Sequence, residues 1–163
     1  MILKQYYDAL SACATGNKVS IASYGGSTYD VPNSGASKLL QLYSGMGTVA
    51  TGTWATGVLF GGSDVVPNIK DNKLNSLISG LSGTAAVTTT VDSTNCLTTI
   101  SSVLTITNDN DTDVTINEIG LNLNYTGNWS FLVERTVLDA PLTIPAGGIG
   151  KVTYTIRMNY PTA

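Results

Sequence analysis

The sequence contains no histidine, and this absence removes the most common catalytic chemistries. Serine and cysteine hydrolases need an imidazole as general base, and most zinc sites use histidine ligands. Carboxylate-only chemistry, as in retaining glycosidases, needs two carboxyl groups about 5 Å apart. Most of the eleven acidic residues fall in expected turns, where solvated aspartate is ordinary. The sequence therefore predicts a protein that is not an enzyme.

Charge is also scarce, because charged residues make up only 12% of the chain. The eight basic residues are scattered and the net charge is −3, whereas sequence-independent nucleic-acid binding needs a basic stripe. No apolar run reaches the ~18 residues of a membrane span. We therefore expect neither nucleic acid nor membrane as a partner. Low charge suits a surface covered by copies of the chain or by other proteins, and it equally suits a sturdy β-domain.

Cysteine and cofactor motifs offer little chemistry either. Cys13 and Cys96 lie far apart without CxxC spacing; they could pair, but free buried thiols are the expectation for a chain made in a reducing cytosol. The glycines of Gly57-Val-Leu-Phe-Gly-Gly lack the Lys-Ser/Thr that follows in a phosphate-binding loop. No cofactor is expected.

The chain is rich instead in segments where apolar residues alternate with Thr, Ser or Asn. This pattern dominates the stretch from Leu97 to Tyr160. In its last segment Val152, Tyr154, Ile156 and Met158 would share one face of a strand. The alternation predicts an all-β fold, an antiparallel β-sandwich of Ig-like or jelly-roll-like type, with a short N-terminal helix.

One irregularity interrupts the alternation. Val114 and Ile116 are followed by Ile119, Leu121 and Leu123, a slip of one residue. A β-bulge at Asn117-Glu118 would return both apolar sets to the core, so we expect a bulge there.

The N-terminal region has a different character. Residues 1–16 have helical apolar spacing and a glycine stop, and residues 19–31 resemble a hairpin with a glycine turn. The helix could pack on its own sheet or dock onto a neighbouring subunit. We interpret residues 1–56 as an extension packed on or swapped with neighbours, and residues 57–163 as the β-sandwich domain. The candidate assembly residues are Leu3, Tyr6, Tyr7 and Leu10.

An acidic turn provides the sharpest cluster of possible metal ligands. Asp109, Asp111 and Asp113 alternate and could converge on a hard cation such as Ca²⁺. The EF-hand glycine and its final glutamate are missing, since Gly120 occupies the last position. We favour a hairpin connection rich in turn residues over a metal site.

A set of blocks between residues 57 and 158 resembles small virion structural proteins of tailed bacteriophages, of the head-decoration or tail and fibre-attachment type. The blocks are Gly57–Leu81, Leu104–Asn108, Thr115–Leu121, Phe131–Gly148 and Val152–Ile156. They follow a pattern of an Asn-Glu-Ile-Gly-Leu strand, Arg-x-Val-Leu, a proline turn and a final Thr-Tyr-Thr-Ile strand. The resemblance implies a location in the virion after synthesis in the bacterial cytoplasm. It also implies assembly with copies of the chain and other virion proteins, and carries over no active-site residues.

The resemblance favours a non-enzymatic capsid-decoration protein or tail or fibre adaptor. The alternative is a carbohydrate-binding or adhesin module with host surface glycans as ligands. Its aromatic platforms would be Tyr24, Tyr29, Trp54, Tyr125 and Trp129. Clustering of Trp54, Tyr125 and Trp129 on one exposed face would favour sugar binding, and their burial would favour assembly.

Overall fold

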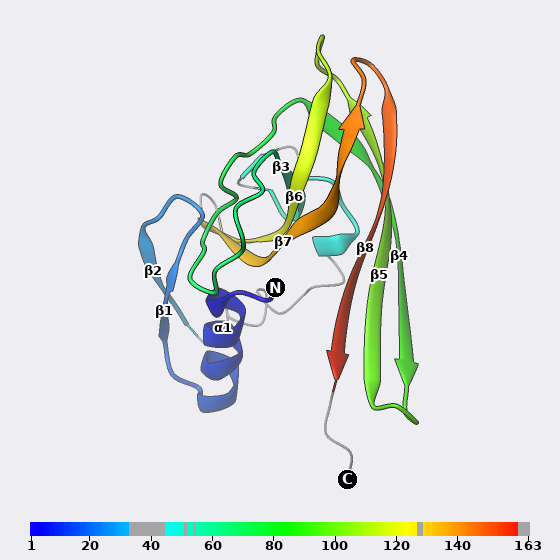
Figure 1. Cartoon of the computed structure of the whole chain (residues 1–163). Helices are drawn as coiled ribbons and strands as arrows, with labels where there is room; N and C mark the ends of the chain where they lie inside the picture. Colours follow the sequence, from blue (N-terminus) through cyan, green and yellow to red (C-terminus); the bar gives the residue numbers. More distant parts are fainter. Residues whose placement is uncertain (33–44, 51, 54, 127–128, 160–163) are drawn as a thin grey trace.

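The computed structural model describes residues 1–32, 45–50, 52–53, 55–126 and 129–159 (Figure 1). At residues 125 and 126 it describes the backbone only. Within these ranges one helix is followed by eight strands. In chain order they are α1 (Lys4–Thr15), β1 (Val19–Ala22), β2 (Thr28–Val31), β3 (Gly57–Gly61), β4 (Leu81–Asp92), β5 (Leu97–Asn108), β6 (Val114–Thr126), β7 (Trp129–Ile144) and β8 (Ile149–Asn159).

Two antiparallel three-stranded sheets form the body of the fold. Their strand orders are β3-β6-β7 and β4-β5-β8, and β1 and β2 form a separate hairpin. In Figure 1 the long sheet of β4, β5 and β8 lies on the right, with β3, β6 and β7 as a second layer beside it. The predicted all-β, sandwich-like fold with a short N-terminal helix is confirmed.

The alternation in the sequence corresponds to the two faces of the β4-β5-β8 sheet. Ile100, Leu104 and Ile106 of β5 are buried, as are Tyr154 and Ile156 of β8. Their neighbours on the other face are mainly Thr, Ser and charged residues that are exposed or half-buried. Burial of one apolar face per strand is the main source of stabilisation, at about 25 cal/mol per Å² of apolar surface.

The predicted irregularity in β6 is confirmed, and most of the unpaired residues at this point belong to β7. The pairing passes from Ile116↔Leu142 to Glu118↔Val137, so one residue of β6 faces four residues of β7. After the shift the apolar side chains of β6 return to the core, as predicted. The buried set is Ile116, Ile119, Leu121 and Leu123.

The N-terminal segment packs against the same chain. Helix α1 ends at Gly16, whose φ of 73° is the left-handed conformation that glycine adopts without strain. The helix contacts β1 and β7. Its Ala9 and Ala12 belong to the same hydrophobic cluster as Val58 and Phe60 of β3. The core therefore runs across residue 57, the boundary at which the sequence suggested a separate domain.

Candidate functional site

The most informative feature for function is how the outer strands of the two sheets are covered. The first outer strand, β7, is covered by the start of the chain. Ile2 forms an antiparallel bridge with Glu134. The Leu3 N–H donates to the Val133 carbonyl at 2.9 Å, and the Arg135 N–H donates to the Met1 carbonyl at 3.0 Å. The N-terminal residues thus act as a short extra strand beside β7.

The outer strands β3 and β8 are protected in other ways. Val49 bridges Val58 of β3 in parallel, and Leu77 bridges Gly61 at the end of the same strand. Strand β8 carries Lys151 and Arg157, both exposed. Charged side chains on an outer strand are a common protection against pairing with another chain.

Within the described part of the chain, strand β4 has none of these protections. Among the described residues it pairs with β5 alone, in an unbroken register from Leu81↔Asn108 to Asp92↔Leu97. Leu81–Val91 contains no charged residue and no proline. Natural proteins usually avoid a long, regular and uncharged outer strand, because its free backbone groups can pair with another chain. Strand β4 is therefore the candidate interaction site.

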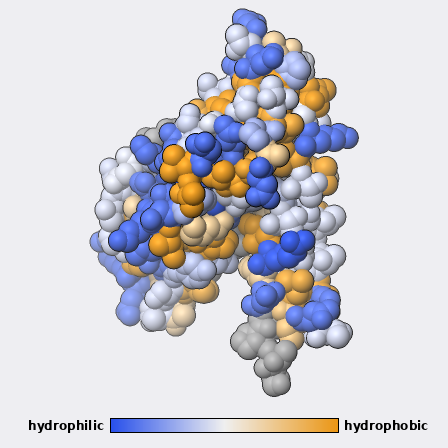
Figure 2. Space-filling view, in the orientation of Figure 1, coloured by the Kyte–Doolittle hydropathy of each residue, from blue (hydrophilic) through white to orange (hydrophobic). Residues whose placement is uncertain are grey.

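The side chains along β4 are also largely exposed to solvent. Most residues from Gly83 to Asp92 are exposed, and the Val91 side chain is 68% exposed. Figure 1 shows the lower halves of β4, β5 and β8 extending beyond the layer of β3, β6 and β7. Figure 2 shows the surface over these strands as mainly pale and orange between isolated blue groups. A partner strand at this edge would meet threonine, alanine and valine.

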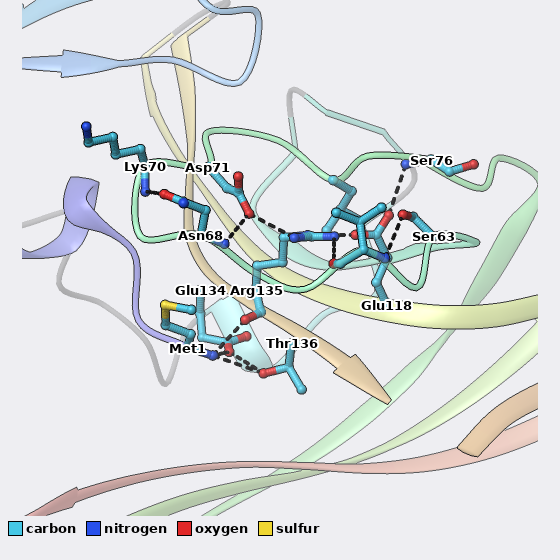
Figure 3. A network of polar contacts seen from close by, with 12 residues as sticks. Met1, Ser63, Asn68, Lys70, Asp71, Ser76, Glu118, Glu134, Arg135 and Thr136 are labelled. Carbon is cyan, nitrogen blue, oxygen red and sulfur yellow. Dashed lines mark hydrogen bonds and ion pairs between the residues drawn. The ribbon is translucent and has the colours of Figure 1, made fainter. Parts of the chain in front are cut away.

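In the sheet of β3, β6 and β7, three charged side chains are buried, those of Glu118, Glu134 and Arg135 (Figure 3). The Arg135 side chain on β7 is fully buried. Its Nε donates to Glu118 Oε2 at 2.7 Å, its Nη1 to Asp71 Oδ2 at 2.8 Å and its Nη2 to the Val65 carbonyl at 2.8 Å. Glu118 is also fully buried and accepts a bond from the Ser76 N–H at 3.0 Å.

This cluster ties the connection between β3 and β4 to the β6–β7 pair. Because the Arg135 and Glu118 side chains have no exposed surface, they offer nothing to a substrate. The assignments made from the sequence did not include them. A usable signal was present, since Glu118 directly precedes the apolar Ile119 and the pair Glu134-Arg135 directly follows the apolar run Phe131–Val133. Charged residues are rarely fully buried unless they are paired.

A second polar cluster surrounds Glu134. The α-amino group of Met1 lies 2.5 Å from Glu134 Oε1, and the Thr136 hydroxyl also donates to this carboxylate. The Tyr154 hydroxyl of β8 donates to Glu134 Oε2. Burial raises the pKa of Tyr154 well above its usual value, and the Glu134 charge adds to the effect. This hydrogen bond joins the two sheets and keeps the phenol protonated.

The four candidate assembly residues do not form one surface. Leu3 is completely buried within its own chain, so it has no surface to offer a partner in this fold. Tyr6 is half-buried and packs against the core. Tyr7 and Leu10 are about half exposed, at 52% and 48%. Leu3 and Tyr6 therefore stabilise the fold of the chain itself.

The acidic turn joins β5 to β6 and is organised by Asn108. This buried side chain donates to the carbonyls of Thr112, Ile144 and Pro145 at 2.9–3.0 Å. Asp113 accepts a bond from the Ala146 N–H. Within the described residues no three His, Cys, Asp or Glu side chains group as metal ligands. Asp109, Asp111 and Asp113 all lie in this exposed turn.

The aromatic residues of the sugar-binding alternative are not gathered at one described site. Tyr24 is buried, and its hydroxyl accepts a bond from the Leu74 N–H. Tyr29 and Trp129 are half-buried with ring centroids 4.4 Å apart. Trp54 and the Tyr125 side chain lie outside the described part of the chain.

Both cysteines, Cys13 and Cys96, are free thiols and half-buried. No helix in the described ranges has the length and apolar character needed to cross a membrane.

Comparison with protein-family models, curated proteins and solved structures found no significant match to this chain.

Proposed function

We propose that this chain is a non-enzymatic structural protein of a bacteriophage particle, a capsid-decoration protein or a tail or fibre adaptor. It acts by assembling with copies of itself and with other particle proteins. The observation that carries the proposal is the open edge of β4, a strand of twelve residues that is uncharged from Leu81 to Val91 and is paired on one side within the described structure. The resemblance of residues 57–158 to virion proteins supports the same conclusion.

An open strand edge is a means of assembly because it offers a full set of directional bonds. In an antiparallel pair, alternate residues exchange two backbone hydrogen bonds, so every second residue of β4 directs its N–H and C=O away from β5. A strand from another protein can satisfy these groups, as in recognition by strand addition. In a cell such an edge would attract unwanted partners, so its retention is best explained by a partner that covers it.

The distribution of charge agrees with this role. The fully buried side chains of Arg135 and Glu118 form an ion pair within the fold, where they fix a loop. From Ser82 to Thr90 the outer face of β4 carries only Ser, Thr and Ala, and the exposed Asp92 lies beyond them at the end of the strand. Such a face can enter an interface without removing charges from water, which costs several kcal/mol per ion.

Mass spectrometry of density-purified particles from a host that carries the gene tests the proposal. We expect peptides of this chain in the particle fraction at a fixed ratio to the major particle proteins. Complementation with the variant Thr84→Lys/Thr88→Lys should remove the chain from particles, because both substitutions lie on β4. The matched control Thr153→Lys/Asn159→Lys adds the same charge on β8 and should leave incorporation unchanged. Recovery of the wild-type chain only in the soluble fraction would contradict the proposal.

A further inference from the structure

We infer that the partner of β4 is β4 of a second copy of this chain, paired antiparallel about a two-fold axis at Ala86. This inference rests on the proposed function and deepens it by naming the partner and the register. The uncharged segment of β4 runs from Leu81 to Val91. Two copies that overlap along this whole segment in antiparallel orientation are centred on its midpoint, which is Ala86.

The register matches the two faces of the sheet. Residues directly opposite each other in an antiparallel pair share a face. Odd-numbered residues of β4 lie on the core face of the sheet, since Ala85 is paired with the buried Leu104. Even-numbered residues of β4 lie on the outer face, since Ala86 is paired with the exposed Val103. A two-fold axis at Ala86 places odd residues opposite odd and even opposite even. The inner pairs are Leu81–Val91, Gly83–Thr89 and Ala85–Val87, and the outer pairs are Ser82–Thr90, Thr84–Thr88 and Ala86–Ala86.

This pairing resolves the exposure of Val91. The Val91 side chain is 68% exposed although it follows the inner, apolar face of β4. In the dimer it lies opposite Leu81 of the second copy, and Val87 lies opposite Ala85. Apolar pairs of this kind favour strand association.

Charge also favours a second copy. The nearest charged residue in the strand, Asp92, falls opposite Gly80 of the partner and outside the uncharged overlap. The two Asp92 side chains lie at opposite ends of the paired segment, so they do not oppose each other. The joined strands would exchange about ten backbone hydrogen bonds. A two-fold pairing occupies the β4 edge of both copies, so the contact closes as a dimer and does not propagate into a fibre.

Charge-swap variants provide the first test. In this register Thr84 lies opposite Thr88 of the partner, and both side chains are exposed on the outer face of β4. We expect wild-type protein to have twice the mass of one chain in sedimentation velocity. Thr84→Glu/Thr88→Glu and Thr84→Lys/Thr88→Lys should each raise the dimer dissociation constant roughly tenfold or more, because like charges then lie opposite each other twice. An equimolar mixture of the two variants should recover the dimer.

The matched control is Thr153→Glu/Asn159→Glu, two exposed positions on β8 of the same sheet. It should remain dimeric. A wild-type chain that is monomeric at high concentration, or a dimer unaffected by the β4 charges, would overturn the inference. A mixture of the two β4 variants that stays monomeric would also overturn it. Circular dichroism of each variant checks that the fold is retained.

Disulfide trapping tests the register and does not depend on the charged variants folding. Residues directly opposite in an antiparallel pair have Cα atoms about 4.5–5.5 Å apart, within the range that a disulfide spans. Ala86→Cys should therefore form a covalent dimer on mild oxidation. Thr153→Cys on β8, and the unsubstituted chain with its own Cys13 and Cys96, should give only background. Equal cross-linking in all three proteins would refute pairing at Ala86.

The β4 dimer and the proposed function can be tested independently of each other. A chain that is found in particles but is monomeric alone would keep the proposed function and assign the β4 edge to another particle protein. A chain that dimerises through β4 but is absent from particles would keep the dimer and overturn the virion assignment.

Discussion

Removing the positive charge of Arg135 should strongly destabilise the fold. The substitution Arg135→Met keeps most of the volume of the side chain but deletes its three polar contacts, to Glu118, Asp71 and the Val65 carbonyl. Glu118 would then carry an uncompensated charge in a position with no exposed surface. The cost arises from that stranded carboxylate more than from the lost ion pair itself.

The magnitude follows from burial. Breaking a buried pair by removing one partner costs about 3–5 kcal/mol. The Asp71 side chain is 23% exposed, so solvent screens its charge and its loss of a partner adds less than about 1 kcal/mol. We therefore expect Arg135→Met to lower the free energy of unfolding by about 4 kcal/mol. Domains of this kind have only about 5–15 kcal/mol in total.

The double variant Arg135→Met/Glu118→Gln separates the stranded charge from the lost contacts. The amide that replaces the Glu118 carboxylate would be neutral and would keep an oxygen acceptor for the Ser76 N–H. The double variant should therefore be about 2 kcal/mol more stable than the sum of the single changes predicts.

Urea unfolding followed by circular dichroism measures all of these proteins. The exposed Arg157→Met on β8 is the matched control and should change stability by less than about 0.5 kcal/mol. A cost below about 1 kcal/mol for Arg135→Met, or additive single effects, would refute the assigned role of the buried cluster.

Four further outcomes are expected. Burial raises the pKa of Tyr154 in the folded state above its unfolded value. The stabilisation by the protonated phenol is therefore complete below pH ~10 and is lost as pH rises further, by up to about 1.4 kcal/mol per pH unit. Tyr154→Phe should reduce this alkaline loss of stability in urea titrations at about pH 9–12. Asn108→Ala should cost about 2–3 kcal/mol in urea unfolding, because the buried hydrogen bond to the Ile144 carbonyl and the part-buried bonds to the Thr112 and Pro145 carbonyls are lost. Chelator should leave the melting temperature unchanged if Asp109–Asp113 is only a turn, whereas a site occupied at about 100 times its dissociation constant would lose about 2.7 kcal/mol. Deletion of residues 1–16 should destabilise or aggregate the chain, because it uncovers the edge of β7 and removes Ala9 and Ala12 from the core. A truncated protein with native circular dichroism and an unchanged melting temperature would contradict this prediction.

The fold was predictable from the sequence wherever a strand has one buried face. Period-two alternation in β5 and β8 specifies which side chains face the core, and the slip after Ile116 could be interpreted as a bulge because one extra residue restores the buried set. The glycine stop after α1 is local chemistry of the same kind. Strand order was not predictable, because alternation within a strand says nothing about its neighbours.

The candidate site shows the same division. The absence of charge from Leu81 to Val91 is a property of the sequence, but it matters only because the sheet order leaves β4 at an edge. Alternation likewise could not show that Leu3 lies inside the fold and that the first residues cover β7, since those contacts join residues more than 100 positions apart. The sequence by itself determined local conformation, face and composition, since these depend on neighbouring residues. Only the tertiary structure decided which edge stays open and which charges meet in the core, because both depend on strands brought together from distant parts of the chain.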